Sequence, residues 1–149
     1  MDTITYTHQA VTRFQVSSWS ETTLVDIDGT GTRHGEVYTP TRGMSRVEAG
    51  YTYTGDLVGS STMAYLLAYH PGSAPAFGLE HVTGSLEGRE GSFVLRHVGE
   101  HDAEAVTVRV EVLPGMGTGE LAGLRGEGQL RIAGHSEDGY ELVLEYSLG

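Results

Sequence analysis

The chain has 149 residues, long enough for one domain to bury a core without disulfides or a structural metal. It contains no lysine, and nine arginines stand against twenty acidic residues, for a formal net charge of −11. So acidic a chain is a poor partner for nucleic acid or anionic lipid, and the absence of cysteine excludes disulfides and thiolate chemistry.

Short segments in which polar and apolar residues alternate predict an all-β fold. Twenty-two glycines and only four prolines separate these segments, and a period of two is typical of a strand with one buried face. In chain order the predicted strands are residues 12–19, 46–54, 62–69, 76–86, 92–98, 105–113, 127–133 and 140–146. The pattern is clearest in 105–113, where four valines share one face. No segment has a convincing helical period.

The number of strands predicts a single closed antiparallel eight-stranded β-barrel with an internal apolar cavity. Eight strands close a barrel wide enough for side chains or for one small ligand. Glycine-containing turns at 54–56 and 70–73 favour antiparallel neighbours. We expect residues 1–149 to form one domain, with 1–10 as an N-terminal arm. Residues 26–44, rich in glycine and threonine, are expected to form a long irregular loop that acts as a lid or a binding loop.

Three motifs that suggest a cofactor or a nucleophile are incomplete. The glycine-rich segment 114–119 (PGMGTG) leads into another strand instead of the helix that phosphate binding requires. His97 and His101 are four residues apart, and Glu80 is a further metal ligand by type, but the ligand set is short. No serine lies in a Gly-x-Ser-x-Gly elbow. We therefore expect neither a metal nor another cofactor.

Charged neighbours indicate which side chains face the interior, because an unpaired charge is costly there. With Arg96 outside, His97 faces inward. In 76–86 two arrangements stay open, since either the odd-numbered or the even-numbered residues can face the cavity. If Glu80 faces inward, the cavity holds a carboxylate and an imidazole able to exchange protons near neutral pH. In the other interpretation the two side chains only hydrogen-bond each other and stiffen the barrel.

The candidate site therefore combines two polar residues with an apolar wall. We expect Glu80 to act as acid or base and His97 as its partner. The residues expected to bind the substrate are Tyr53, Tyr65, Leu67, Phe93, Leu95, Met116, Leu144 and Tyr146. An apolar cavity with a few convergent polar groups is typical of a small-molecule site. Several strands carry apolar residues on both faces, so we also expect a homo-oligomer, most simply a dimer.

Five blocks of the sequence resemble, in order, successive blocks of one family: 53–57 (YTGDL), 65–69 (YLLAY), 78–84 (GLEHVTG), 91–97 (GSFVLRH) and 117–126 (GTGELAGLRG). It is an uncharacterised bacterial family, known as a domain of unknown function, and it is similar to the allene oxide cyclase barrel. The similarity runs from about residue 12 to residue 148. The resemblance implies an eight-stranded barrel with an internal cavity, and it carries over Glu80, His97 and the segment 19–21. Met116 and the long connection 26–44 depart from the family pattern.

Barrels related to this family include plant allene oxide cyclases, dirigent proteins and bacterial polyketide cyclases that close rings without a cofactor. The resemblance therefore implies a cofactor-free isomerase or cyclase acting on a polyketide-like or lipid-like molecule, in natural-product biosynthesis. Two alternatives stay open: a non-catalytic carrier of a hydrophobic ligand, and a dirigent-like scaffold that only orients a reaction. The first residues lack the basic and apolar blocks of a signal peptide, and no apolar run is long enough to span a membrane. We expect a cytoplasmic protein.

Overall fold

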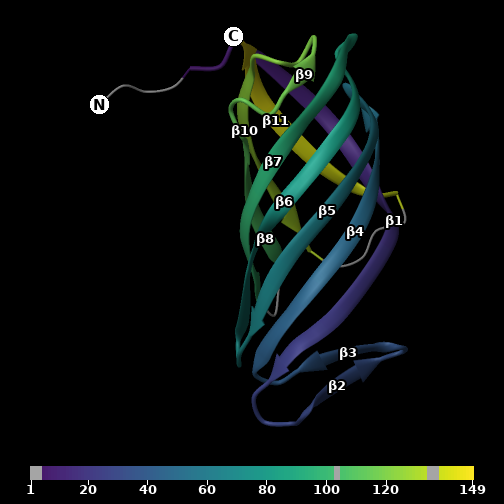
Figure 1. The fold of residues 1–149 in the computed structure, drawn as a ribbon, viewed down its shortest axis with the longest axis vertical. Coiled ribbons are helices and arrows are strands. Elements are labelled where there is room, and N and C mark those ends of the chain that lie inside the picture. The colour runs from purple at the N-terminus through teal and green to yellow at the C-terminus, as the bar shows by residue number, and fades with distance from the viewer. Residues whose placement is uncertain (1–4, 103–104, 134–137) are drawn as a thin grey trace.

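The computed structural model describes residues 5–102, 105–133 and 138–149, and all regular structure within them is β (Figure 1). The strands are β1 (His8–Asp26), β2 (Gly31–His34), β3 (Val37–Pro40), β4 (Gly43–Gly55), β5 (Leu57–Tyr69), β6 (Ser73–Leu86), β7 (Arg89–Asp102), β8 (Val106–Val112), β9 (Thr118–Gly119), β10 (Leu124–Ile132) and β11 (Tyr140–Leu148). The predicted all-β class is confirmed.

Eight of these strands form one closed antiparallel barrel. Hydrogen-bonded neighbours follow the order β6-β5-β4-β1-β11-β10-β8-β7, and β7 pairs again with β6 to close the ring. The short strand β9 pairs with the start of β7, and β2 and β3 form a separate hairpin. The predicted eight-stranded barrel is therefore confirmed. Because the sheet closes on itself, each of the eight strands has a hydrogen-bonded neighbour on both sides over part of its length.

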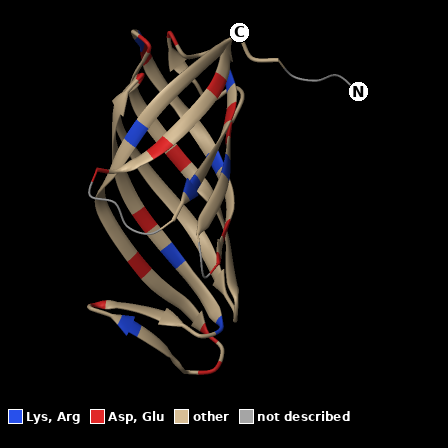
Figure 2. Ribbon diagram, turned by 180° about the vertical axis from the view of Figure 1, so that it is seen from behind, with Lys and Arg blue, Asp and Glu red and all other residues tan. Residues whose placement is uncertain are grey.

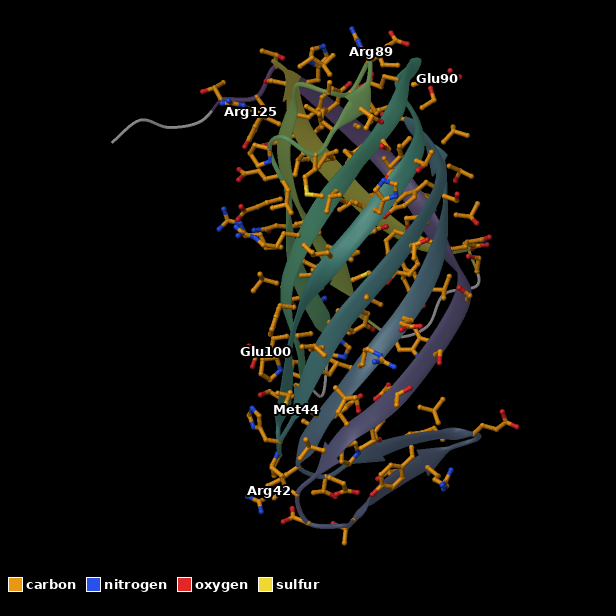
Figure 3. All side chains as sticks on the ribbon, in the orientation of Figure 1. Arg42, Met44, Arg89, Glu90, Glu100 and Arg125 are labelled. Carbon is orange, nitrogen blue, oxygen red and sulfur yellow. The ribbon has the colours of Figure 1, made fainter. Side chains whose placement is uncertain are left out.

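The two ends of the barrel carry different parts of the chain. Arg89 and Glu90 lie at the end near the C-terminus, which we call the upper end, whereas Arg42 and Met44 lie at the lower end beside the β2–β3 hairpin (Figures 1 and 3). A large cluster of buried side chains fills the upper part, including Phe14, Tyr53, Leu86, Phe93 and Tyr146. A smaller cluster fills the lower part, including Val47, Met63, Tyr65, Leu67 and Ala74.

The segments expected to be an arm and a loop are more regular than their composition indicates. Strand β1 begins at His8, inside the expected arm 1–10, and runs to Asp26. The segment 26–44 is not one irregular loop, because most of it forms the β2–β3 hairpin, whose turn includes Gly35 with φ 66°. The many glycines and threonines of this segment suggested a loop, although its residues alternate as those of short strands do. Glycine adopts the positive φ that the turn of a hairpin requires. The hairpin lies beyond the lower end of the barrel (Figure 1).

The alternation of buried and exposed residues decides the orientation of β6. Gly78, Glu80 and Val82 face inward, and Glu80 is completely buried. Phe77 and Leu79 face outward, with 62% and 50% of their surfaces exposed. The even-numbered arrangement of this strand is therefore correct, and it places a carboxylate in the barrel interior.

The outer surface carries both signs of charge. Figure 2 shows arginines and acidic residues interspersed along the strands of the rear face. Several form exposed ion pairs, such as Arg96 with Glu111 at 2.7 Å, and such pairs stabilise a fold little. None of the described residues belongs to a helix long and apolar enough to cross a membrane.

Gly78 is required by close packing inside the wall of the barrel. A β-carbon at this position would lie 2.3 Å from the carbonyl oxygen of Ala64 and 2.3 Å from Cβ of Tyr65. We expect Gly78→Ala to lower the free energy of unfolding by about 1–3 kcal/mol, the usual cost of overpacking, as measured by urea denaturation. Thr62→Ala, on the exposed face of β5, is the control. A Gly78→Ala protein as stable as this control would contradict the close packing.

Candidate functional site

The centre of the candidate site is a buried carboxylate held by two side chains. Glu80 projects from β6 into the interior and has no exposed surface. The hydroxyl of Tyr53 on β4 donates a hydrogen bond of 2.5 Å to Oε2 of Glu80. The second oxygen, Oε1, lies 2.7 Å from Nε2 of His97 on β7. These three side chains come from three strands and form one buried hydrogen-bonded group, which we call the Tyr53–Glu80–His97 triad.

With Glu80 ionised, its hydrogen bond to His97 sets the tautomer of the imidazole ring. A carboxylate can only accept hydrogen bonds, so Nε2 of His97 carries the proton that Glu80 accepts. The other ring nitrogen, Nδ1, makes no hydrogen bond within the described part of the chain. In the neutral ring Nδ1 therefore presents a lone pair, and the adjacent carboxylate stabilises the imidazolium that forms when Nδ1 takes up a proton. This is the arrangement of a general base.

Tyr53 remains a hydrogen-bond donor over the whole physiological pH range. Burial raises its pKa well above the ordinary value of 10, and the negative charge of Glu80 raises the pKa further. The neutral phenol therefore satisfies one oxygen of a carboxylate that would otherwise be buried without a partner.

A pocket of about 180 Å³ reaches His97 from the lower half of the barrel. Its aromatic lining consists of Phe14, Trp19, Tyr51, Tyr65, Tyr140 and Phe77, the last of which borders the pocket from β6 although 62% of its surface is exposed. Its aliphatic lining includes Met63, Val106, Val108, Leu130 and Ile132. Tyr53 and Glu80 are not among the lining residues, so His97 is the member of the Tyr53–Glu80–His97 triad that a ligand in the pocket would touch.

The pocket lies where the barrel wall is incomplete. Within the described part of the chain, the β1–β11 ladder covers His8 to Phe14, and below Phe14 strand β1 pairs with β4. The β10–β11 ladder stops at Gln129. Trp19 and Tyr140 line the pocket beside this gap in the ladders, and 45% of the surface of Trp19 is exposed.

Two tyrosines of the lining supply uncharged hydroxyl groups. Burial is the main cause that raises the pKa of Tyr51 and that of Tyr65, and a nearby carboxylate adds to it in each case, Glu80 for Tyr51 and Glu21 for Tyr65. Both phenols therefore stay protonated at neutral pH and can donate a hydrogen bond to an oxygen of a bound molecule. Such donors stabilise negative charge that develops on an enol or enolate oxygen.

The structure brings together only part of the expected site. His97 and Tyr65 line the pocket, and Glu80 and Tyr53 lie directly behind His97. The other expected binding residues pack in the core instead of lining the pocket: Leu67 in the lower cluster, and Phe93, Leu95, Leu144 and Tyr146 in the upper cluster. Met116 lies outside the barrel, on the turn before β9, with 52% of its surface exposed.

Several pocket residues were not expected from the sequence. Trp19 faces inward because register shifts, one of them between Val16 and Ser18, change which residues of β1 point to the interior. His101 lines the pocket, although its spacing from His97 suggested only a metal ligand. Among the residues that the structure describes, no three histidine or acidic side chains are placed to hold a metal ion. Phe14 could have been found from its alternation with Thr12 and Ala10, which are also buried.

Comparison with known proteins gives a family and a related structure. A model of the family described as "Protein of unknown function (DUF3224)" matches residues 10–144. A crystal structure of a DUF3224 protein of unknown function from Shewanella oneidensis MR-1 has 25% sequence identity and a TM-score of 0.75, covering 95% of this chain and 97% of that chain. No curated protein matches the chain.

Proposed function

The chain belongs to the DUF3224 family, and from the geometry of its pocket we propose that it is a cofactor-free isomerase or cyclase for a small apolar molecule of polyketide or lipid origin. The observation that carries the proposal is His97, which lines the pocket and is hydrogen-bonded through Nε2 to the buried carboxylate of Glu80. We also propose that the family is related to the allene oxide cyclase-like barrels, which the closed eight-stranded barrel supports.

In the proposed reaction Nδ1 of His97 removes a proton from a carbon or hydroxyl of the bound molecule. The electron pair left behind moves to an oxygen of the same molecule, which accepts a hydrogen bond from Tyr51 or Tyr65. Glu80 stabilises the imidazolium, which then returns the proton to a different atom. No atom is gained or lost, so the product is an isomer of the substrate. The aromatic walls hold the flexible molecule in the conformation that reacts.

Deuterium incorporation tests this function on whichever molecule the pocket retains during purification. Any molecule that co-purifies with the protein is extracted, identified by mass spectrometry and returned to the apoprotein in D₂O. We expect an isomer of unchanged composition that has gained one deuterium for each proton transferred through the solvent-exchanged imidazole. A carrier or an orienting scaffold would return the molecule unchanged and unlabelled, and that result would contradict the proposal.

We further propose that the assembled protein is a homodimer, joined through an outer apolar patch formed by Leu66, Phe77, Leu79 and Val98. These residues are neighbours on β5, β6 and β7, and three of them have half or more of their surface exposed. Arg46 and Glu48 flank the patch on β4, and Arg109 and Glu111 flank it on β8. Each flank carries one arginine and one glutamate. In a two-fold dimer the arginine of one copy can therefore pair with a glutamate of the other, despite the net charge of −11.

The dimer predicts a specific effect of one substitution. Phe77→Asp places a charge at the centre of the patch, and we expect it to raise the dimer dissociation constant at least about tenfold, as is typical of a central aromatic contact. Sedimentation equilibrium measures the change, with Val58→Asp as the control, because Val58 is equally exposed but lies at the upper end of β5. A wild-type protein that is monomeric at micromolar concentration would contradict the dimer.

A further inference from the structure

A second polar group lies at the lower end of the pocket. His101 lines the pocket, four residues after His97 on the same inward face of β7, with Gly99 between them. The hydroxyl of Tyr69 donates a hydrogen bond of 2.8 Å to Oε2 of Glu21. The charge of Glu21 also acts on His101. A histidine accompanied by a carboxylate and a tyrosine thus occurs at both ends of the pocket, and the proposed proton transfer uses only the upper one.

His101 is uncharged at neutral pH. Burial lowers its pKa, and the opposing effect of Glu21 is smaller. The neutral imidazole can donate a hydrogen bond through one nitrogen and accept one through the other. It is therefore suited to an uncharged polar group such as a hydroxyl or a carbonyl.

The charges around the pocket argue against an anionic ligand. No arginine lines the pocket among the residues that the structure describes, and carboxylates lie near both of its histidines. A carboxylate or phosphate of the ligand would therefore be partly buried without a cation and close to Glu80 or Glu21. Burial of an unpaired charge is costly, and like charges add to that cost.

The volume of the pocket corresponds to about one ring. A pocket of about 180 Å³ is slightly larger than a cavity of about 150 Å³ that binds benzene. The α-carbons of His97 and His101 are about 13 Å apart, since a strand rises about 3.3 Å per residue. A ligand that lies along β7 makes one hydrogen bond of about 2.8 Å to each histidine. Subtracting both from the separation of about 13 Å leaves about 8 Å between the two polar atoms of the ligand.

We propose that the pocket binds an uncharged, ring-sized molecule that carries a hydrogen-bonding group at each end, one bound by His97 and the other by His101. The negative charge of Glu21 near His101 rejects anions. The inference rests on the proposed function and narrows its substrate class: fatty acids and other carboxylates are excluded, and so are long polyketide chains.

Three phenols of similar size test the inference by titration calorimetry. 4-Ethylphenol has one polar end, 4-(2-hydroxyethyl)phenol has two uncharged ends, and 4-hydroxyphenylacetate has one uncharged and one anionic end. We expect the second to bind about three- to tenfold more tightly than the first, the contribution of one hydrogen bond. We expect the third to bind at least about tenfold more weakly than the second.

Two variants assign these preferences to residues. His101→Phe should abolish the advantage of 4-(2-hydroxyethyl)phenol over 4-ethylphenol while leaving the affinity for 4-ethylphenol within about twofold. Glu21→Gln should reduce the rejection of 4-hydroxyphenylacetate. His81→Phe, on the outward face of β6, is the matched control and should change neither preference.

Equal affinities for the three probes, an advantage that survives His101→Phe, or no binding of any probe at millimolar concentration would each overturn the inference. The probes do not react, so these outcomes are independent of the deuterium experiment, in which the proposed function fails if the recovered molecule is unlabelled.

Discussion

Glu80→Gln is expected to lower turnover by about two to four orders of magnitude, the range associated with loss of a general acid or base. Glutamine has nearly the same shape, so Tyr53 retains an acceptor and the barrel retains its packing. The substitution removes the negative charge that stabilises the His97 imidazolium. The NH2 group of the glutamine can also donate a hydrogen bond to Nε2 of His97. The tautomer with a lone pair on Nδ1 is then no longer favoured.

The rate of deuterium incorporation into the co-purified molecule measures this effect, and calorimetry with the same molecule measures binding. We expect the dissociation constant to change by less than about threefold, because Glu80 does not line the pocket. His97→Gln should lower the rate at least as much. Glu48→Gln, on the exposed face of β4, is the control. If Glu80→Gln reacts at the wild-type rate, His97 is not activated by Glu80, and catalysis by shape alone becomes the better explanation.

If Glu80→Gln does react at the wild-type rate, substitutions that change the bulk of the pocket lining still distinguish an orienting scaffold from a carrier. In a scaffold, a change of bulk at Tyr65 or Tyr51 should alter both the rate and the product, because these rings shape the pocket. In a carrier, the same changes should alter only the dissociation constant. The three functions that stay open from the sequence therefore give three different patterns across one set of variants.

The fold could be predicted from the sequence because local and global patterns agree. Val110 and Val112 of β8 are buried as the period of two requires, and so are Leu142 and Leu144 of β11. A strand whose two faces differ in polarity has only one register that buries the apolar face. Eight such strands with short turns then have few topologies available besides a closed barrel.

The site was harder to predict than the fold, because the alternation of polar and apolar residues does not reveal strand orientation in β6, register shifts in β1 or where the interior is left unfilled. Strand β6 carries Phe77 and Leu79 on its outer face, so hydrophobicity alone would have pointed Glu80 outward. The register shifts in β1 bring Trp19 to the pocket. Packing also divides the interior, so that Phe93 and Tyr146 fill the upper core while the pocket lies in the lower half. The sequence identifies inward residues, but it does not show which of them border that space.

A second large effect is expected at alkaline pH, where the barrel should unfold cooperatively between about pH 10 and 12. Five tyrosines have strongly raised pKa values, and burial is the largest cause for each: Tyr51, Tyr53, Tyr65, Tyr69 and Tyr146. For Tyr146, burial and its hydrogen bond to Glu87 raise the pKa to about 12. The unfolded chain, in contrast, titrates near the ordinary value of 10.

The sign of the effect follows from which state holds the protons. Below pH 10 both states keep their phenolic protons, so the stability that depends on the neutral tyrosines is fully present. Above pH 10 the unfolded chain releases protons that the folded barrel retains, which favours unfolding by about 1.4 kcal/mol per pH unit for each tyrosine. Near pH 11 the five tyrosines together remove at most about 7 kcal/mol, because the half-buried Tyr69 contributes less than the others, and this is comparable with the whole stability of an ordinary domain.

Circular dichroism and tyrosinate absorbance, followed together against pH, measure this transition. We expect both signals to change at the same pH in one steep step, because the buried phenols ionise only when the barrel opens. Tyr146→Phe removes one of the five groups, so the loss of stability with pH should become shallower by about 1.4 kcal/mol per pH unit. A gradual titration centred near pH 10 with the β-structure intact would show that the phenols are accessible in the folded state. The barrel interior would then be hydrated, and the apolar pocket on which the proposed chemistry depends would not exist in solution.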